Sequence, residues 1–87
     1  MRLIFSAIKF QFKNDTHWQI MSGYRHSDIY KMMSQLNILY NKNTKEEGFL
    51  TDDYKFIKRS DAIKYAKESG QISKDFNNNL LLSEDLW

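Results

Sequence analysis

The 87-residue sequence contains no cysteine and no proline, and only three glycines and two histidines. Without cysteine the chain can form neither a disulfide framework nor a thiolate metal site, so nothing calls for an oxidising compartment. Two histidines are too few for a convincing zinc or iron centre, and we expect no cofactor. No apolar stretch approaches the ~20 residues of a transmembrane helix, and no leader-type cleavage pattern follows the first residues. The sequence therefore predicts a protein of the cytoplasm, in the interior of a host cell, without a membrane partner.

A strong charge of one sign is also lacking. Thirteen lysines and arginines stand against eleven acidic residues, which gives a formal net charge of +2. Nucleic-acid-binding modules usually present a dense basic face, whereas these lysines are scattered, so we expect no nucleic-acid partner. Hydrophobic residues make up 41% of the chain and aromatic residues 15%, enough for one core with some rings left at the surface. We therefore expect a single domain over residues 1–87 that assembles as a homo-oligomer.

The apolar pattern predicts an α+β domain in the order β-β-α-β-β-α with a docked C-terminal tail. Residues 2–13 alternate along a strand but carry apolar side chains on both faces, which indicates a strand covered on two sides. Turn-forming residues 14–16 separate it from a second strand over residues 17–24. Short strand-like runs at residues 48–51 and 54–57 predict a second hairpin.

Two helices are predicted, each with a serine in the N-cap position. Ser27 precedes an apolar stripe at helical spacing that runs to about Asn37. Ser60 precedes the second helix, which ends at Gly70 because glycine readily adopts the left-handed conformation of a helix terminus. Residues 80–87 are rich in leucine and end in tryptophan, so we expect this tail to dock on the core or on a partner subunit.

Two of the three arginines lie where a strand meets a helix. Arg25 and His26 precede the first helix, and Arg59 stands at the start of the second. Free amides at a helix N-terminus, together with a guanidinium fork, favour phosphate or carboxylate. The alternative is structural: an exposed Arg25 and half-buried His26 at a helix cap, and an ion pair from Arg59 to Asp61 or Glu84.

Polar residues near the C-terminus extend the candidate ligand site. The amide of Gln71 could contact a base edge, although such a residue more often ties down a loop. Ser83 and Glu84 offer acceptors for ribose hydroxyls, and the alternative is that they bond backbone amides or pair with Arg25 or Arg59. An aromatic side chain such as Trp87 could stack on a base, but packing is the commoner role.

The residue sets that catalysis requires are thin. The sequence has no glycine-rich phosphate loop and no metal-ligand spacing. His26 with Asp28 or Glu84 is the one acid–base pair that the chain offers, and nothing places a nucleophile beside it. An enzyme that processes nucleotides is therefore the third hypothesis, behind binding of a small ligand and binding of a protein.

From Arg25 onward the chain resembles a family of short phage and prophage proteins. The resemblance covers about 63 residues and rests on the order and spacing of several motifs. These are Arg25-His26-x-Asp28, Glu47-Gly48-Phe49-Leu50-Thr51, Phe56 and Arg59 with Ala62 and Ala66, Gly70-Gln71-Ile72, and Leu82-Ser83-Glu84-Asp85-Leu86-Trp87. The family carries no settled activity.

The resemblance implies a phage-type protein with polar residues gathered on an apolar scaffold. Those residues are Arg25, His26, Asp28, Arg59, Gln71, Ser83 and Glu84. Because small phage proteins are often counter-defence factors, we expect binding and sequestration of a small anionic ligand, a nucleotide signal by analogy. The alternative is a protein–protein inhibitor of a host defence factor.

Overall fold

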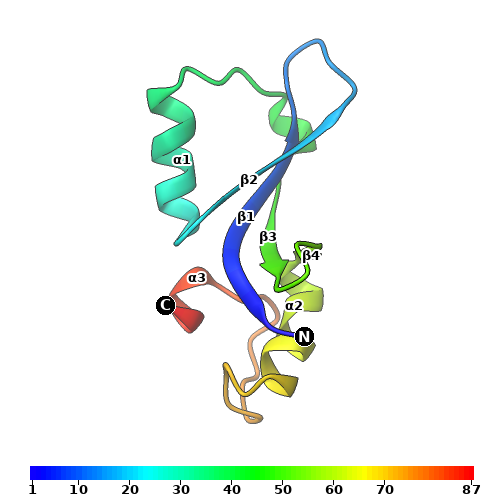
Figure 1. Ribbon diagram of the computed structural model, residues 1–87, viewed down its shortest axis with the longest axis vertical. Coiled ribbons are helices and arrows are strands. Elements are labelled where there is room, and N and C mark those ends of the chain that lie inside the picture. Colours follow the sequence, from blue (N-terminus) through cyan, green and yellow to red (C-terminus); the bar gives the residue numbers. More distant parts are fainter.

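The computed structural model describes residues 1–87 and confirms the predicted α+β order (Figure 1). Its elements are β1 (Leu3–Gln11), β2 (Trp18–Gly23), α1 (His26–Gln35), the 3₁₀ turn η1 (Lys42–Thr44), β3 (Glu46–Thr51), β4 (Phe56–Lys58), α2 (Arg59–Glu68) and α3 (Ser83–Leu86). The strands form one antiparallel sheet in the order β2-β1-β3-β4. The molecule is elongated, 42 × 23 × 23 Å, with α1 towards one end and α2 towards the other. No helix is long and apolar enough to cross a membrane.

Both long helices cover the same face of the sheet. Residues opposite each other in neighbouring strands share a face, and Ser6 lies opposite Phe49. Ile8 and Phe10 share this face because they lie two and four residues beyond Ser6 on the same strand. A register shift between Leu3 and Phe5 then turns Leu3 to the helix side as well.

The helix-covered face carries two small apolar cores. Near α1 the buried residues are Ile8, Phe10, Ile29 and Met33. Near α2 they are Leu3, Phe49, Ala62, Ala66 and Leu81. The two alanines let α2 approach the sheet closely, and the burial of Leu81 confirms that the C-terminal segment docks on the core of its own chain.

The opposite face of the sheet is largely open, so the prediction that the first strand is covered on two sides is wrong. Trp18 is 52% exposed, Ile20 is exposed next to it on β2, and Phe5 is exposed towards the other end of β1. Only side chains of the sheet itself shield this face: the ammonium group of Lys9 lies 4.8 Å from the Trp18 ring centre. The helices follow β2 and β4, and both cross to the same side.

The predicted serine caps are also wrong. Helix α1 begins at His26 with Arg25 as N-cap, and α2 begins at Arg59 with Lys58 as N-cap, neither with a side-chain cap bond. At α1 a distant residue supplies the missing acceptor, because the His26 amide donates to the Ser83 hydroxyl at 3.1 Å. Gly70 does end the second helical segment in the left-handed conformation, with φ of 76°.

Candidate functional site

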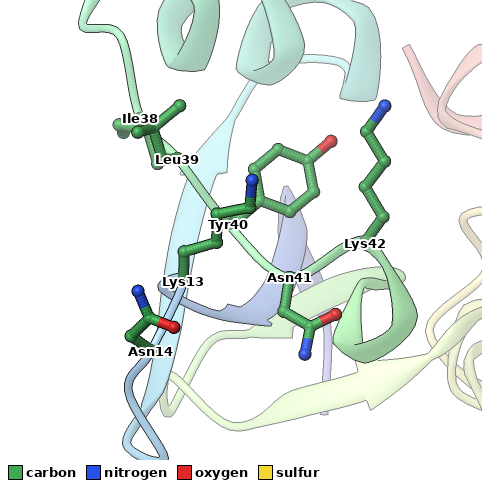
Figure 2. Close-up of a pocket in the computed structure, with 7 residues that line it drawn as sticks. All are labelled: Lys13, Asn14, Ile38, Leu39, Tyr40, Asn41 and Lys42. Atoms are coloured by element: carbon green, nitrogen blue, oxygen red, sulfur yellow. The ribbon is translucent and has the colours of Figure 1, made fainter.

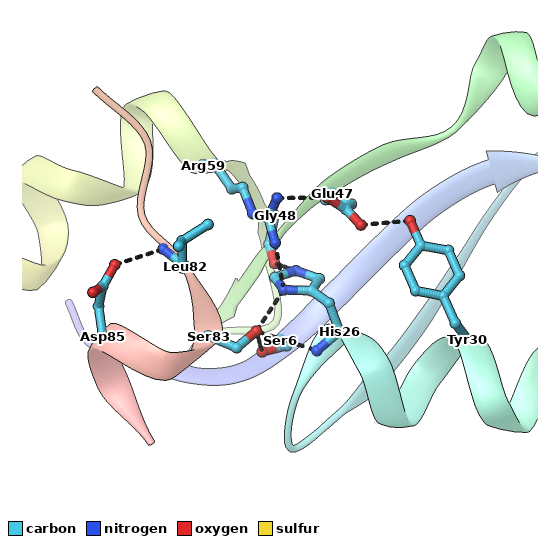
Figure 3. Close-up of polar contacts among 9 residues, drawn as sticks. All are labelled: Ser6, His26, Tyr30, Glu47, Gly48, Arg59, Leu82, Ser83 and Asp85. Carbon is cyan, nitrogen blue, oxygen red and sulfur yellow. Dashed lines mark hydrogen bonds and ion pairs between the residues drawn. The ribbon is translucent and has the colours of Figure 1, made fainter. Parts of the chain in front are cut away.

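Between the two cores lies a polar cluster formed by Ser6, His26, Tyr30, Glu47, Arg59 and Ser83 (Figure 3). The ring of His26 is its centre: Nε2 lies 2.7 Å from the carbonyl oxygen of Gly48. A carbonyl only accepts, so Nε2 carries the proton and Nδ1 is an acceptor. Nδ1 then receives the Ser83 hydroxyl at 2.5 Å and an Arg59 Nη2 donor at 3.0 Å.

Glu47 links the two helices through this cluster. Its Oε1 accepts from Arg59 Nη1 at 2.5 Å, and its Oε2 accepts from the Tyr30 hydroxyl at 2.5 Å. The ion-pair partner of Arg59 is therefore Glu47, and the predicted pairing with Asp61 or Glu84 is wrong. Burial raises the pKa of Tyr30, and its hydrogen bond to Glu47 adds to the rise.

The cluster keeps His26 neutral and out of reach of solvent. Burial lowers the pKa of His26, a tendency that the Gly48 hydrogen bond opposes and the charge of Arg59 reinforces. The residue is 5% exposed and lines none of the three cavities. Neither Asp28 nor Glu84 bonds to its ring, and both are exposed.

Arg25 lies at the end of the tail. Its Nη2 donates to the main-chain oxygen of Trp87, and its guanidinium carbon lies 5.5 Å from the Tyr24 ring centre. The Tyr24 and Trp87 rings are 5.9 Å apart. Arg25 lines no cavity, and no hydrogen bond joins it to Arg59. Its observed role is to hold the tail.

Gln71 replaces a missing strand partner. Its Oε1 accepts from the Leu3 amide at 2.9 Å, and its Nε2 donates to the Leu3 carbonyl at 2.8 Å. A side-chain amide has the same donor and acceptor as a peptide group, so Gln71 pairs with β1 where β2 has already ended. Of the seven predicted site residues, the structure joins His26, Arg59 and Ser83 in one cluster. It does not bring Arg25, Asp28, Gln71 or Glu84 into hydrogen-bond contact with that cluster.

The largest cavity lies elsewhere, between the β1–β2 turn and the segment that follows α1 (Figure 2). It has a volume of about 530 Å³ and is lined by Lys13, Asn14, Ile38, Leu39, Tyr40, Asn41 and Lys42; we call it the cleft. Two backbone hydrogen bonds hold its walls together, Lys13 N–H to the Leu39 carbonyl at 3.1 Å and Asn41 N–H to the Gln11 carbonyl at 2.9 Å.

The cleft is basic and has unused hydrogen-bonding groups. It has two lysines and no carboxylate, and neither Lys13 nor Lys42 forms an ion pair. Because Phe12 and Tyr40 form an antiparallel bridge whose hydrogen bonds come from their neighbours, the main-chain N–H and C=O of Tyr40 point away from β1. No group of the chain bonds them. Figure 2 shows the amides of Asn14 and Asn41 at the cleft with the Tyr40 ring.

The surface has two smaller cavities, each with a volume of about 320 Å³. One lies against α1 and shares Ile38, Leu39 and Tyr40 with the cleft. The other lies at the start of α2 and contains Arg59, the single predicted site residue that lines any cavity. There Arg59 and Lys58 are paired with Glu47 and Glu46. No three acidic or histidine side chains gather closely enough to hold a metal ion.

Sequence reasoning missed the cleft because its walls are far apart in the chain: Lys13 and Ile38, for example, are separated by 25 positions. Each wall looks ordinary by itself: a turn on one side and a polar connection on the other. Only the bridge between Phe12 and Tyr40 brings them together, and a lone bridge leaves no periodic pattern in the sequence. The pair Lys13-Asn14 and the pair Asn41-Lys42 were the available hint.

In a comparison with protein families, the family model described as Phage T4 y16D protein matches residues 2–87. This supports the resemblance to small phage proteins and extends it over nearly the whole chain. No curated protein and no solved structure matches the chain.

Proposed function

The chain belongs to the phage T4 y16D protein family, and from that premise we propose that this phage protein captures a small anionic ligand in the cleft. The observation that carries the proposal is the pair of unpaired lysines, Lys13 and Lys42, beside an apolar and aromatic wall without any carboxylate. The proposed ligand is still a small anion, as the sequence predicted, but its proposed site is the cleft and not the junctions that contain Arg25 and Arg59.

The size and chemistry of the cleft favour a nucleotide. Ligand sites commonly measure roughly 300–1,000 Å³ and combine an apolar lining with a few polar groups. The cleft, at about 530 Å³, fits this description. Lys13 and Lys42 offer ammonium groups to phosphate, and the Tyr40 ring offers a stacking surface. The Asn14 amide offers a donor and an acceptor to a base, and Asn41 offers its Nδ2 donor, because its Oδ1 already accepts from the Asn43 amide at 3.1 Å.

The cavity beside Arg59 is a weaker candidate. Its lining holds three cations and two carboxylates, and Glu46 and Glu47 neutralise two of the cations. An anion entering there would have to displace an ion pair or approach a carboxylate. The cleft presents two cations and no carboxylate, so the electrostatic comparison favours it.

Binding without turnover agrees with the position of His26. A general acid or base must reach its substrate within hydrogen-bonding distance, and His26 is buried behind Ser83 and Gly48. A phage protein that binds a host nucleotide signal and keeps it intact would lower the concentration of that signal. This is the counter-defence role that we propose for the sequestration.

The test measures binding of a panel of cyclic and ADP-ribose-type nucleotides by titration calorimetry, and analyses the bound and free species by mass spectrometry. We expect one or more members to bind and to be released intact on denaturation. Replacing both Lys13 and Lys42 by alanine should weaken binding by at least about ten-fold, because each ammonium–phosphate contact contributes on the order of 1 kcal/mol.

The matched control is Lys74→Ala, which removes an exposed lysine that lines no cavity. It should bind like the wild type. Equal loss in the control and in the double variant would point to unspecific charge attraction, and recovery of altered nucleotide would point to an enzyme. Absence of binding by every nucleotide would overturn the proposal.

A second candidate, an inhibitor of a host protein, is favoured by a different observation. Twelve large apolar side chains are exposed, against eleven hydrophobic residues in the core. Leu36, the C-cap of α1, and Leu39, which lines the cleft, are 62% and 68% exposed. If a protein is the target, Leu36→Lys should abolish its capture while the Lys13 and Lys42 variants retain it.

A further inference from the structure

The hydrogen bonds of Gln11 reveal which backbone groups of β2 face outward. The Gln11 amide donates to Thr44 Oγ1 at 2.9 Å, and its carbonyl accepts from the Asn41 amide at 2.9 Å. Both groups therefore point away from β2, and Gln11 forms a non-hydrogen-bonded pair with Trp18. It follows that the N–H and C=O of Trp18 point to the outer edge of the sheet.

The same direction holds for every second residue of β2. The register between β1 and β2 is unbroken from Gln11–Trp18 to Ser6–Gly23. Ile20 and Ser22 thus also direct their N–H and C=O groups outward. No hydrogen bond from elsewhere in the chain reaches these groups. Strand β2 is a free edge on which three alternate residues direct their main-chain groups outward.

This edge lacks the features that usually prevent pairing with another strand. Proteins protect edges with charged residues, proline, bulges or very short strands. β2 spans six residues, Trp-Gln-Ile-Met-Ser-Gly, with no charge, no proline and no bulge. The opposite edge, β4, has three residues and ends in Lys58, so it is short and charged.

We propose that β2 pairs with β2 of a second copy of this chain, in antiparallel orientation about a two-fold axis at Ile20. In this register Ile20 lies opposite Ile20 of the other copy, and Trp18 lies opposite its Ser22. All three outward-facing residues then exchange their main-chain hydrogen bonds. The two sheets join into one sheet of eight strands, four from each chain.

Charge and side-chain placement favour a second copy in this orientation. Asp15 and Arg25 flank the strand, five positions before and five positions after Ile20. Within the chain, the Asp15 side chain bonds His17, and the Arg25 side chain bonds the Trp87 main-chain oxygen and lies near the Tyr24 ring. Antiparallel pairing about Ile20 brings the acidic end of one strand to the basic end of the other, whereas parallel pairing would bring like charges together. The exposed side chains of Trp18 and Ile20 lie on one face, so Ile20 meets its copy at the axis and each Trp18 lies diagonally next to Ile20 of the other copy.

The proposal is independent of the ligand proposal, since no residue of the cleft lies on β2. The edge pairing predicts that the mass measured by sedimentation equilibrium doubles as the protein concentration rises from about 1 μM to about 1 mM. This range covers the dissociation constants of weak and moderately stable dimers. Amide exchange followed by NMR gives a second readout. The Gln19 and Met21 amides should be protected at every concentration, and the Ile20 and Ser22 amides only where the dimer forms.

Two variants of Ile20 remove the pairing. Ile20→Pro deletes an outward-facing N–H that β1 does not use, so the fold of the monomer keeps its hydrogen bonds. Ile20→Lys places two like charges at the two-fold axis and is used if the proline variant loses its circular dichroism spectrum. Each should remain monomeric at the highest concentration.

The matched control is Phe5→Lys, which charges another exposed apolar position on the open face, but in the central strand β1. It should dimerise like the wild type. A chain that stays monomeric throughout, or a dimer that Phe5→Lys disrupts and Ile20→Lys does not, would overturn the edge pairing. A dimer without concentration-dependent protection of the Ile20 amide would overturn it equally.

Discussion

The ring of His26 fits its surroundings only in the neutral form. Nδ1 accepts from Ser83 and Arg59, while Nε2 donates to the Gly48 carbonyl. Protonation at Nδ1 would set an N–H against the Arg59 donor and a positive charge against the guanidinium. Burial makes that charge still less favourable, which is why the pKa of His26 lies below its ordinary 6.5.

This arrangement predicts a stability that depends on pH. In the unfolded chain His26 takes up a proton near pH 6.5, whereas in the folded chain it resists protonation to lower pH. The unfolded state therefore binds more protons in that window, and the free energy of unfolding falls as pH drops below 6.5. The slope from this one group is at most about 1.4 kcal/mol per pH unit.

Urea unfolding between about pH 8 and pH 5 measures how the free energy of unfolding changes with pH. This range spans the ordinary pKa of a histidine side chain. His26→Asn should be less stable at the upper end and should show a flatter profile, because the group that titrates is gone. His17 is exposed and present in both proteins, so it cancels in the comparison. Parallel profiles for the two proteins would contradict the role of His26.

At the scale of single elements, distant contacts determine details that local sequence does not. The first amide of α1 is capped by Ser83, which lies 57 residues away, although Ser27 stands next to the helix start. Gln71 extends the pairing of β1 from a loop after α2. Both polar residues belong to the predicted ligand site, yet both are engaged in holding one element against another.

The hairpin of β3 and β4 gives a prediction at this scale. A Cβ added at Gly48 would lie 2.2 Å from the Ile57 carbonyl oxygen and 2.7 Å from the Phe56 ring, and backbone atoms yield little. Gly48→Ala should therefore lower the free energy of unfolding by about 3 kcal/mol, the upper end for overpacking. Urea unfolding at constant pH provides the measurement.

Gly70→Ala is the matched control. Its added Cβ would meet nothing within 4 Å, so the cost comes from the left-handed φ of 76° alone. That conformation costs an alanine about 1 kcal/mol. If the two variants lost equal stability, the close approach of β4 to Gly48 would be wrong.

At the scale of the whole molecule, the polar cluster joins two separate apolar cores. Glu47 contacts Tyr30 on α1 and Arg59 on α2, so it connects the helix of one core to the helix of the other. Arg59 and Glu47 are 19% and 26% exposed, so much of their charge is removed from water. A partly buried pair is costly to break because the remaining charge loses its partner.

Glu47→Ala is accordingly expected to reduce the free energy of unfolding by about 2–3 kcal/mol. Glu46→Ala is the neighbouring control: its ion pair with Lys58 spans 3.5 Å, and both side chains are more exposed than those of the Glu47–Arg59 pair, so it should cost less than about 1 kcal/mol. Thermal or urea unfolding distinguishes them. Equal losses would show that the cluster does not connect the two cores.

The sequence predicted the architecture well because the architecture depends on local patterns. The alternation of residues 3–11, the helical spacing after Ser27 and the left-handed Gly70 each leave a trace within a few residues of the chain. The order of strands and helices and the docked tail follow from such traces.

The site was harder to predict because it depends on pairs that are far apart in the chain. Arg59 pairs with Glu47, and Lys13 lies beside Leu39. Both neighbourhoods follow from the way the strands pair in the sheet, and no sequence motif indicates them. The arginine at each strand-to-helix junction was predicted to contact an anionic ligand. The structure gives Arg25 and Arg59 partners within the chain, and leaves the lysines of the cleft without one.

The most direct test of the account is to locate the bound ligand on the isotopically labelled protein by NMR. On titration with a nucleotide that binds, we predict shifts of the backbone amides at residues 13–14 and 38–42, with the signals of His26 and Ser83 unchanged. Shifts centred on Lys45, Lys58 and Arg59, or on the tail around Arg25 and Trp87, would contradict the assignment of the site to the cleft.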